Sequence, residues 1–229
     1  MPTINDNLVR VYDRISRAAA RAGREASSIQ LIAVSKTKPL SMIEEARRAG
    51  VTDFGENRVQ EALEKIRQDD GATWHLIGPL QRNKARFAVR IFDMIHSVDR
   101  LSLGQELDRR LQATGRTMPV LIQVNTSSEE TKAGVEPDRA LELAEQLSVL
   151  TGLAVRGLMT IPAFTPDPED ARPAFRLLRE TRDRIASAGV EGVGMDVLSM
   201  GMSHDFEVAI EEGADMVRIG TAVFGARQA

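Results

Sequence analysis

The chain has 229 residues, of which 42% are hydrophobic and 28% are charged, an ordinary composition for a globular protein. Its 30 lysines and arginines are balanced by 33 aspartates and glutamates, which argues against a dedicated nucleic-acid surface, because such a surface needs a basic excess. Cysteine is absent, so disulfides, thiolate catalysis and zinc–cysteine sites are excluded.

The first segment predicts an amphipathic helix over about residues 5–23, because apolar residues from Leu8 to Ala22 recur at three- and four-residue spacing. Gly23 is placed to end it. The segment has no basic region before an apolar stretch, so we expect no secretion signal. No apolar run approaches the roughly 20 residues that cross a bilayer. We therefore expect a cytoplasmic protein with neither a membrane nor a nucleic acid as its partner.

Beyond this helix, short apolar runs alternate with helical patterns. The eight predicted strands are residues 30–36, 52–56, 74–78, 93–98, 119–125, 154–160, 195–200 and 215–220. Eight strands, each followed by a helical pattern, predict an α/β fold, a (β/α)8 TIM barrel that forms a single domain over residues 1–229. An open, doubly wound sheet is the alternative, since strand count cannot show closure. The missing Gly-x-Gly-x-x-Gly pattern after the first strand weakens that alternative.

Active sites of such barrels lie at the C-terminal ends of the strands, where the first strand delivers Lys36. Side chains alternate along a strand, so Lys36 shares a face with Ile32 and Val34. A lysine buried there would have a lowered pKa and could form a Schiff base with a carbonyl compound. Taken alone, the stretch LIAVSKTKPL favours a solvent-exposed lysine at the end of a strand.

The segments after the seventh and eighth predicted strands indicate a phosphate site. Ser199 and Ser203 lie in LSMGMSH, and Gly220 and Thr221 follow the last strand. These two loops commonly form the phosphate site of a barrel, where small residues let backbone N–H groups approach the anion. Either loop alone is better explained as a plain turn. Together, at these two strands, they favour a phosphorylated ligand.

Arg218 precedes that loop and should point into the barrel. A buried guanidinium needs a partner, which could be a carboxylate such as Glu56 or an acceptor on the ligand. If the ligand contains a pyridine ring, Arg218 could donate to the ring nitrogen. Because arginine stays protonated, that nitrogen would stay unprotonated, and the cofactor would be a weaker electron sink.

The whole pattern resembles the pyridoxal phosphate homeostasis protein family, which is similar to the N-terminal domain of bacterial alanine racemase. The matching segments are AVSKTKP (33–39), FGENRVQE (54–61), WHLIGPLQRNK (74–84), QVNTSSEETKAGV (123–135), GLMTIP (157–162), LSMGMSHD (198–205) and VRIGTAVFG (217–225). They follow one another from the first strand to the last, so the resemblance covers nearly the whole chain.

The resemblance implies a barrel that binds pyridoxal 5'-phosphate (PLP) as an aldimine on Lys36. It implies Ser203, Gly220 and Thr221 around the phosphate, Arg218 near the pyridine nitrogen, and Asn57 and Met200 in the pocket wall, with Ser199 beside them. It further implies a carrier or regulator of PLP and amino-acid balance, without an established reaction. Its partners would be PLP and apo forms of PLP-dependent enzymes, and the protein would be a monomer or a weak homodimer.

Two enzymatic alternatives remain. A racemase needs a second base opposite the lysine, and the only tyrosine, Tyr12, lies in the leading helix. A Schiff-base aldolase acting on a phosphosugar would explain Lys36 and the phosphate loops, but not the full set of matching segments. His204 departs from the family pattern, and we expect it to cap a helix or face solvent. The polar segment 125–134 predicts a solvated connection, with a gate over the cofactor as the alternative.

Overall fold

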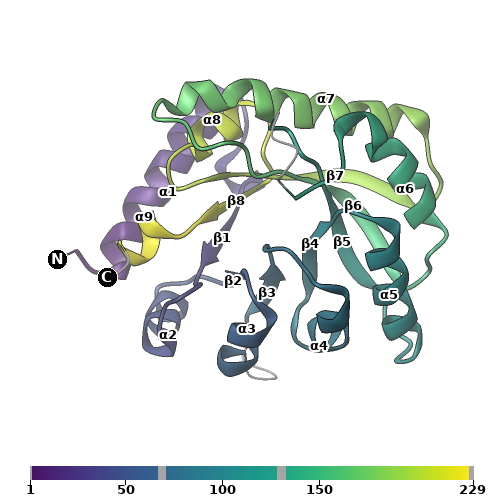
Figure 1. The fold of residues 1–229 in the computed structure, drawn as a ribbon. Helices are drawn as coiled ribbons and strands as arrows, with labels where there is room; N and C mark the ends of the chain where they lie inside the picture. The colour runs from purple at the N-terminus through teal and green to yellow at the C-terminus, as the bar shows by residue number, and fades with distance from the viewer. Residues whose placement is uncertain (1, 67–70, 128–132, 227–229) are drawn as a thin grey trace.

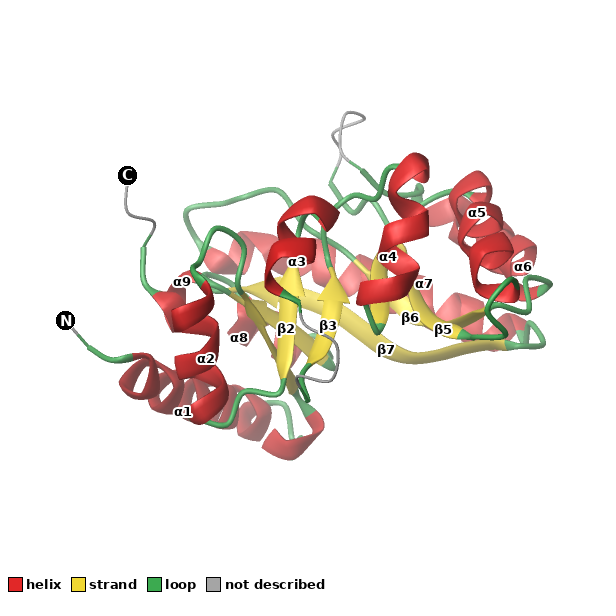
Figure 2. Ribbon diagram, turned by 90° about the horizontal axis from the view of Figure 1, so that it is seen from below, coloured by secondary structure: helices red, strands yellow, loops and turns green. Residues whose placement is uncertain are grey.

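A closed barrel of eight parallel strands forms the centre of the molecule, as the computed structural model shows over residues 2–66, 71–127 and 133–226 (Figures 1 and 2). The strands are β1 (Gln30–Val34), β2 (Asp53–Glu56), β3 (Thr73–Leu76), β4 (Met94–Val98), β5 (Met118–Gln123), β6 (Leu153–Met159), β7 (Val193–Met202) and β8 (Met216–Ile219). Each pairs with its successor, and β1 also pairs with β8 in parallel. The predicted barrel is therefore confirmed, and the open sheet is wrong.

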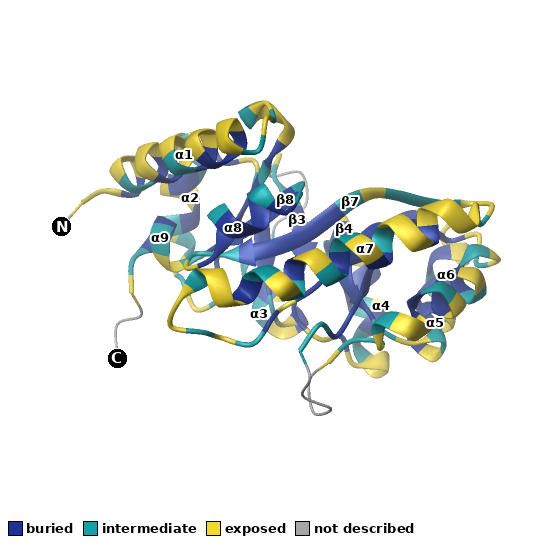
Figure 3. Cartoon of the chain, turned by 90° about the horizontal axis from the view of Figure 1, so that it is seen from above, coloured by how far each residue is buried: buried dark blue, intermediate teal, exposed yellow. Residues whose placement is uncertain are grey.

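The helices cover the outside of the barrel, with their buried faces toward the strands and their exposed faces toward solvent (Figure 3). They are α1 (Ile4–Arg21), α2 (Leu40–Arg48), α3 (Val59–Lys65), α4 (Ala85–Ile91), α5 (Leu101–Gln112), α6 (Ala140–Ser148), α7 (Arg172–Ala188), α8 (Phe206–Glu211) and α9 (Thr221–Phe224). Short 3₁₀ turns lie at η1 (Ala26–Ser28), η2 (Arg82–Lys84), η3 (Pro137–Arg139) and η4 (Pro168–Ala171). No helix within the described ranges has both the length and the apolar character needed to span a membrane.

The leading helix α1 begins with a capping box, which explains why helix formation starts at Ile4. The Thr3 hydroxyl accepts a hydrogen bond from the Asp6 backbone N–H, and the Asp6 carboxylate accepts one from the Thr3 N–H. The apolar face of α1 is buried, and the helix packs against α8 and α9. An ion pair between Arg14 and Glu207 (2.7 Å) adds to this contact. The N-terminal helix thus closes the side of the barrel that carries the last two strands.

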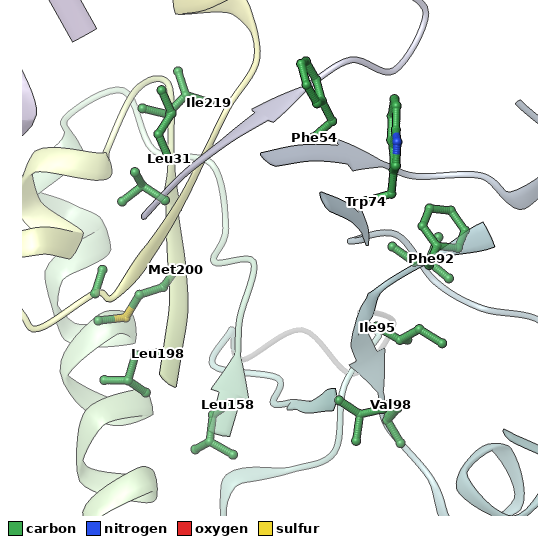
Figure 4. Packing of buried hydrophobic residues seen from close by; sticks show 14 of the residues in the cluster. Leu31, Phe54, Trp74, Phe92, Ile95, Val98, Leu158, Leu198, Met200 and Ile219 are labelled. Carbon is green, nitrogen blue, oxygen red and sulfur yellow. The ribbon is translucent and has the colours of Figure 1, made fainter. Parts of the chain in front are cut away.

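Two separate apolar layers follow from the alternation of side chains along the strands. Outward-facing residues pack against the helices in a large cluster that includes Phe54, Trp74 and Leu198 (Figure 4). Inward-facing residues fill the barrel with a small cluster of Ile32, Met94, Leu121, Met159 and Met216. The middle of the barrel is therefore a packed core, and we expect a ligand site where the strands end.

Candidate functional site

A cavity of about 200 Å³ lies where the strands end at their C-terminal side, the position expected for a barrel active site. Its walls come from residues at or just beyond the ends of six strands. The lining residues are Val34, Lys36, Asn57, Ile77, Ile161, Met202, Ser203, Arg218, Gly220 and Thr221. Six of the eight predicted site residues are therefore brought together in one cavity. Ser199 and Met200 are not among its lining residues.

Lys36 reaches this cavity from a tight turn that follows β1. Ile32 belongs to the interior cluster and Val34 lines the cavity, so the predicted common face of these two residues is confirmed. The strand ends at Val34, and Lys36 is half-buried in the turn. Thr37 has a φ of 64°, a left-handed conformation that is rare for a residue other than glycine. The turn is thus held in a costly conformation beside the lysine.

An ion-pair network behind the turn holds it in place. Lys65 Nζ donates to the backbone carbonyl of Ser35 (2.7 Å), to Glu56 Oε1 (2.8 Å) and to Glu61 Oε1 (2.6 Å). Glu61 Oε1 also accepts from the Thr37 backbone N–H. The Ser35 hydroxyl donates to Glu56 Oε1 (2.7 Å). The backbone on both sides of Lys36 is therefore fixed by charged groups from the neighbouring β2 and α3.

Burial governs the protonation of Glu56 in this network. Its side chain is 0% exposed, and desolvation raises its pKa, whereas the hydrogen bonds from Lys65 and Ser35 oppose the rise. Its second oxygen, Oε2, has no hydrogen-bond partner among the described residues. Lys65 therefore favours the ionised form of Glu56, and burial opposes it. It faces the helices and not Arg218, so the expectation that Glu56 could pair with Arg218 is wrong.

The two predicted phosphate loops meet on the opposite side of the cavity. The Ser203 hydroxyl lies 3.2 Å from the Gly220 backbone nitrogen and 3.3 Å from that of Ala222, and it accepts a hydrogen bond from each N–H. Thr221 begins α9 directly after Gly220. Hydroxyls and backbone N–H groups gather here, and they are the donors that an oxyanion requires.

Arg218 lies in the barrel interior and reaches the cavity from β8. It is 3% exposed and donates to Ser199 Oγ (2.7 Å) and to the Thr160 carbonyl (2.7 Å). Burial lowers the pKa of Arg218 to about 10, while the charge of Asp205 opposes the shift. The guanidinium therefore stays protonated at neutral pH. It brings a fixed positive charge and N–H donors to the cavity.

Alternation along β7 turns Met200 away from the cavity, and a bulge beyond it brings Met202 to the cavity instead. Ser199 pairs with Met216 and Met202 pairs with Arg218, so three steps along β7 match two along β8. Met200 packs in the outer cluster on the same face as Leu198 (Figure 4), whereas Met202, after the extra residue, lines the cavity. Gly201, at the bulge, has a φ of 88°, and a Cβ there would lie 2.6 Å from that of Ala209. In the sequence, Gly201 is the residue that could have indicated the bulge, because glycine readily adopts this conformation.

Asn57 lines the cavity between β2 and β3, and its position depends on a close backbone contact. A Cβ on Gly78 would lie 2.3 Å from the carbonyl oxygen of Asn57, so only glycine fits at residue 78. The side-chain oxygen Asn57 Oδ1 is buried, and no described residue donates to it. A ligand with a hydroxyl or N–H group could satisfy this acceptor.

Two other predicted features lie outside the cavity. His204 is exposed, its Nε2 is 3.1 Å from the carbonyls of Thr165 and Pro166, and its ring lies against Phe164. The polar segment 125–134 includes residues 128–132, which lie outside the described residues, so its role as a gate stays a prediction. Within the described ranges, no cluster of histidine and acidic residues is suited to a metal ion.

Sequence reasoning missed several residues that shape the site. The apolar lining residues Val34, Ile77 and Ile161 follow from the strand ends, but they carry no chemical signal of their own. Lys65 lies in a helix, nine residues from Glu56, and nothing in its spacing points to the turn at Lys36. The interior histidines His75 and His96 carry no recognisable spacing in the sequence. Their contacts come from strands far apart in the sequence.

The comparisons with known proteins agree with this geometry. The chain matches the family described as alanine racemase, N-terminal domain, over residues 7–228. It is 47% identical to the pyridoxal phosphate homeostasis protein of Aquifex aeolicus (strain VF5), over 97% of this chain and 98% of that protein. The protein of the same name from Escherichia coli (strain K12) is also 47% identical, over 99% and 98% of the two chains.

Solved structures give the same result. PipY of Synechococcus elongatus PCC7942, solved with PLP bound, superposes with a TM-score of 0.80 at 38% identity, over 93% of this chain and 100% of that one. An alanine racemase of Clostridium difficile 630 shares the fold with a TM-score of 0.78, at 16% identity and over 58% of its own length. The chain belongs to the pyridoxal phosphate homeostasis protein family, within the alanine racemase N-terminal domain family.

Proposed function

We propose that this protein binds PLP in the cavity at the strand ends and acts as a carrier or regulator of the cofactor. The observation that carries the proposal is that Lys36, Arg218 and the hydroxyl-lined turn at Ser203 and Thr221 line a single cavity. PLP has an aldehyde, a pyridine nitrogen and a phosphate, and these three groups require those three kinds of partner. The relatives that carry the name of PLP homeostasis proteins, and PipY with PLP bound, support the proposal.

Lys36 is the residue that would hold the cofactor covalently. Its amine would hold the aldehyde of PLP as a reversible Schiff base, with one water released on binding. The rigid turn from Ser35 to Thr37 limits where the amine can lie, because Lys65 and Glu61 hold the backbone on both sides of it. When bound, PLP supplies an electron sink for amines attached at that carbon.

The remaining groups would orient the cofactor. The Ser203 and Thr221 hydroxyls would donate to the phosphate beside the small Gly220, and Arg218 would donate an N–H to the pyridine nitrogen. Because Arg218 keeps its proton at neutral pH, the ring nitrogen would stay unprotonated, and the bound cofactor would stabilise a carbanion poorly. This property favours storage or delivery of PLP over vigorous chemistry at the substrate carbon.

The cavity also lacks the second base that a racemase requires. Among its lining residues, Lys36 alone has a side chain that can serve as a general base. His204 is exposed outside the cavity and Tyr12 lies in α1. Accordingly, we expect no appreciable conversion of L-alanine to D-alanine.

The test is a spectroscopic titration of the apo protein with PLP. Wild-type protein should develop the absorption band of a PLP–lysine Schiff base, and Lys36→Ala should lose this band. The control is Lys38→Ala, because Lys38 donates to the backbone carbonyls of Phe224 and Gly225 and does not line the cavity. This variant should keep the band. Wild-type protein without the band, or Lys36→Ala that retains it, would refute the cofactor assignment.

A transfer assay separates a carrier from a buffer. The loaded protein is mixed with apo forms of PLP-dependent enzymes in the presence of a trap for free PLP. Direct delivery should restore enzyme activity despite the trap. Activity that disappears when the trap is added would contradict the carrier role and leave only storage.

A further inference from the structure

A continuous chain of hydrogen bonds crosses the interior of the barrel and ends on Arg218. Asp53 Oδ1 lies 3.1 Å from His75 Nε2, and His75 Nδ1 lies 2.9 Å from His96 Nε2. His96 Nδ1 lies 3.0 Å from Ser199 Oγ, which in turn is 2.7 Å from Arg218 Nη1. The five side chains come from β2, β3, β4, β7 and β8, so no single segment of sequence contains the pattern.

The chemistry of the two ends allows one continuous direction of donation along the chain. A guanidinium can only donate, so Ser199 accepts from Arg218, and its own hydroxyl proton can be given to His96 Nδ1. His96 then carries its proton on Nε2 and donates to His75 Nδ1. His75 likewise carries its proton on Nε2 and donates to the Asp53 carboxylate, which can only accept. In this arrangement each histidine carries one ring proton, on Nε2.

The position of the chain within the barrel matters as much as its direction. Asp53 is the first residue of β2, at the end of the barrel away from the cavity, and its carboxylate is also bound by Gln30 (2.7 Å) and Thr52 (2.7 Å). Arg218 lines the cavity. The chain thus connects the N-terminal ends of the strands, at Asp53, with the cavity at their C-terminal ends.

Burial makes this arrangement costly unless every member is paired. His75 is 2% exposed, His96 and Ser199 are 0% exposed, and Arg218 is 3% exposed. An unpaired polar group at such a depth costs free energy, whereas apolar side chains, as in the neighbouring cluster around Leu121, would fill the space without that cost. Desolvation is the main cause that lowers the pKa of His96, and the positive charge of Arg218 adds to it, in agreement with its neutral form. The chain therefore has to be complete to be stable.

We propose that this buried chain is a positioning relay, in which Asp53, His75, His96 and Ser199 fix the orientation in which Arg218 presents its guanidinium to the cavity. The Thr160 carbonyl holds Nη2, and the relay holds Nη1 through Ser199, so the plane of the guanidinium is set by both contacts. The relay is not a proton path to the ligand, because Arg218 has no acceptor with which to pass a proton on. His75 and His96 are positioning residues. The effect of the relay on PLP binding rests on the proposed function, whereas its effect on the orientation of Arg218 does not.

The first test uses the apo protein and needs no ligand. The ring nitrogens of His75 and His96 are observed by ¹⁵N NMR. We expect each ring to carry one proton, on Nε2. In His96→Leu, the side-chain N–H signals of Arg218 should shift or broaden as the guanidinium loses a fixed partner. Either histidine with its proton on Nδ1, or unchanged Arg218 signals in His96→Leu, would overturn the relay.

The second test measures how substitutions in the relay, at Asp53 and His96, affect the affinity for PLP. Asp53→Ala removes the terminal acceptor without touching the cavity, and His204→Gln is the control histidine outside the relay. With PLP as the probe, Asp53→Ala and His96→Leu should bind about tenfold more weakly, the equivalent of one charged hydrogen bond. Their absorption spectra should also shift, whereas His204→Gln should match wild type.

The outcomes separate the two proposals. A purely structural role would lower the stability of Asp53→Ala and His96→Leu but leave the affinity and the spectrum unchanged, and this result would overturn the positioning role. If the wild-type protein binds no PLP, the proposed function fails, and the NMR measurements on the apo protein still decide whether the relay orients Arg218.

Discussion

The network behind the Lys36 turn leads to a quantitative prediction for Lys65→Met. Methionine keeps most of the length and apolar character of the lysine stem but removes the ammonium group. Three hydrogen bonds are lost, to the Ser35 carbonyl, to Glu56 and to Glu61. Glu56 is then left as a fully buried carboxylate whose remaining donor in the network is the Ser35 hydroxyl.

The expected cost follows from the burial of the pair. Removing one partner of a buried ion pair typically costs about 3–5 kcal/mol, because the other charge stays desolvated. The Lys65 side chain is 11% exposed and Glu56 keeps one hydrogen bond, so we expect the lower end, about 3 kcal/mol. Exposed pairs contribute only about 0–1 kcal/mol. Arg139→Met is a suitable control, since the Arg139 and Glu142 side chains are 70% and 52% exposed.

The dependence on pH distinguishes this mechanism from a general packing defect. The pKa of Glu56 is already raised by desolvation, and the loss of Lys65 raises it further. An acid whose pKa is higher in the folded state than in the unfolded state destabilises the fold as the pH rises through that range. The deficit of Lys65→Met should therefore be largest near neutral pH and should shrink at acidic pH, where Glu56 is protonated.

Urea unfolding of wild type, Lys65→Met, Arg139→Met and the double variant Lys65→Met/Glu56→Gln measures these effects. The double variant removes the unpaired charge, so it should recover part of the lost stability, with a coupling of about 1 kcal/mol or more. If Lys65→Met costs no more than Arg139→Met, or if its deficit is the same at every pH, the reasoning is refuted.

Two further predictions concern the barrel interior and the cavity wall. His96 stays neutral in the folded protein because burial lowers its pKa, whereas in the unfolded chain it takes up a proton below about pH 6.5. Wild type should therefore lose about 1.4 kcal/mol of stability per pH unit below that value. The dependence of stability on pH should disappear in this range in His96→Gln and persist in His204→Gln. Equal dependence in wild type and His96→Gln would contradict the buried neutral form. Gly78→Ala places a methyl group against the Asn57 backbone, so it should weaken PLP binding by distorting the wall, and a crystal structure with Asn57 unmoved would count against this explanation.

Much of the site could be predicted because it depends on regular strands. The alternation of side chains in β1 and β8 correctly assigned Ile32 and Arg218 to the barrel interior, and the strand-end rule placed Lys36, Gly220 and Thr221 at one edge. In β7, Met200 was expected in the pocket wall from the family resemblance, but it lies in the outer cluster with Leu198, two residues before it. The bulge between Ser199 and Met202 breaks the period of two only beyond Met200. Met202 therefore took the place predicted for Met200.

The remaining features depend on contacts between distant segments, which one sequence does not reveal. Closure of the barrel needs β1 to pair with β8, and a strand count is compatible with an open sheet. The contact between His96 and Ser199 joins residues 103 positions apart. Lys65 meets Glu56 because α3 folds back over β2, and this packing becomes visible only in three dimensions.

The central claim is that Lys36 holds PLP by a reversible covalent bond, and chemical trapping tests it most directly. The PLP-loaded protein is reduced with borohydride, which makes the bond permanent, and is then digested for peptide mapping by mass spectrometry. The account predicts one reduced pyridoxal phosphate group per chain, on the peptide that carries Lys36, and none in Lys36→Arg. A modification on a different lysine, or loaded protein in which Lys36 stays unmodified, would contradict it.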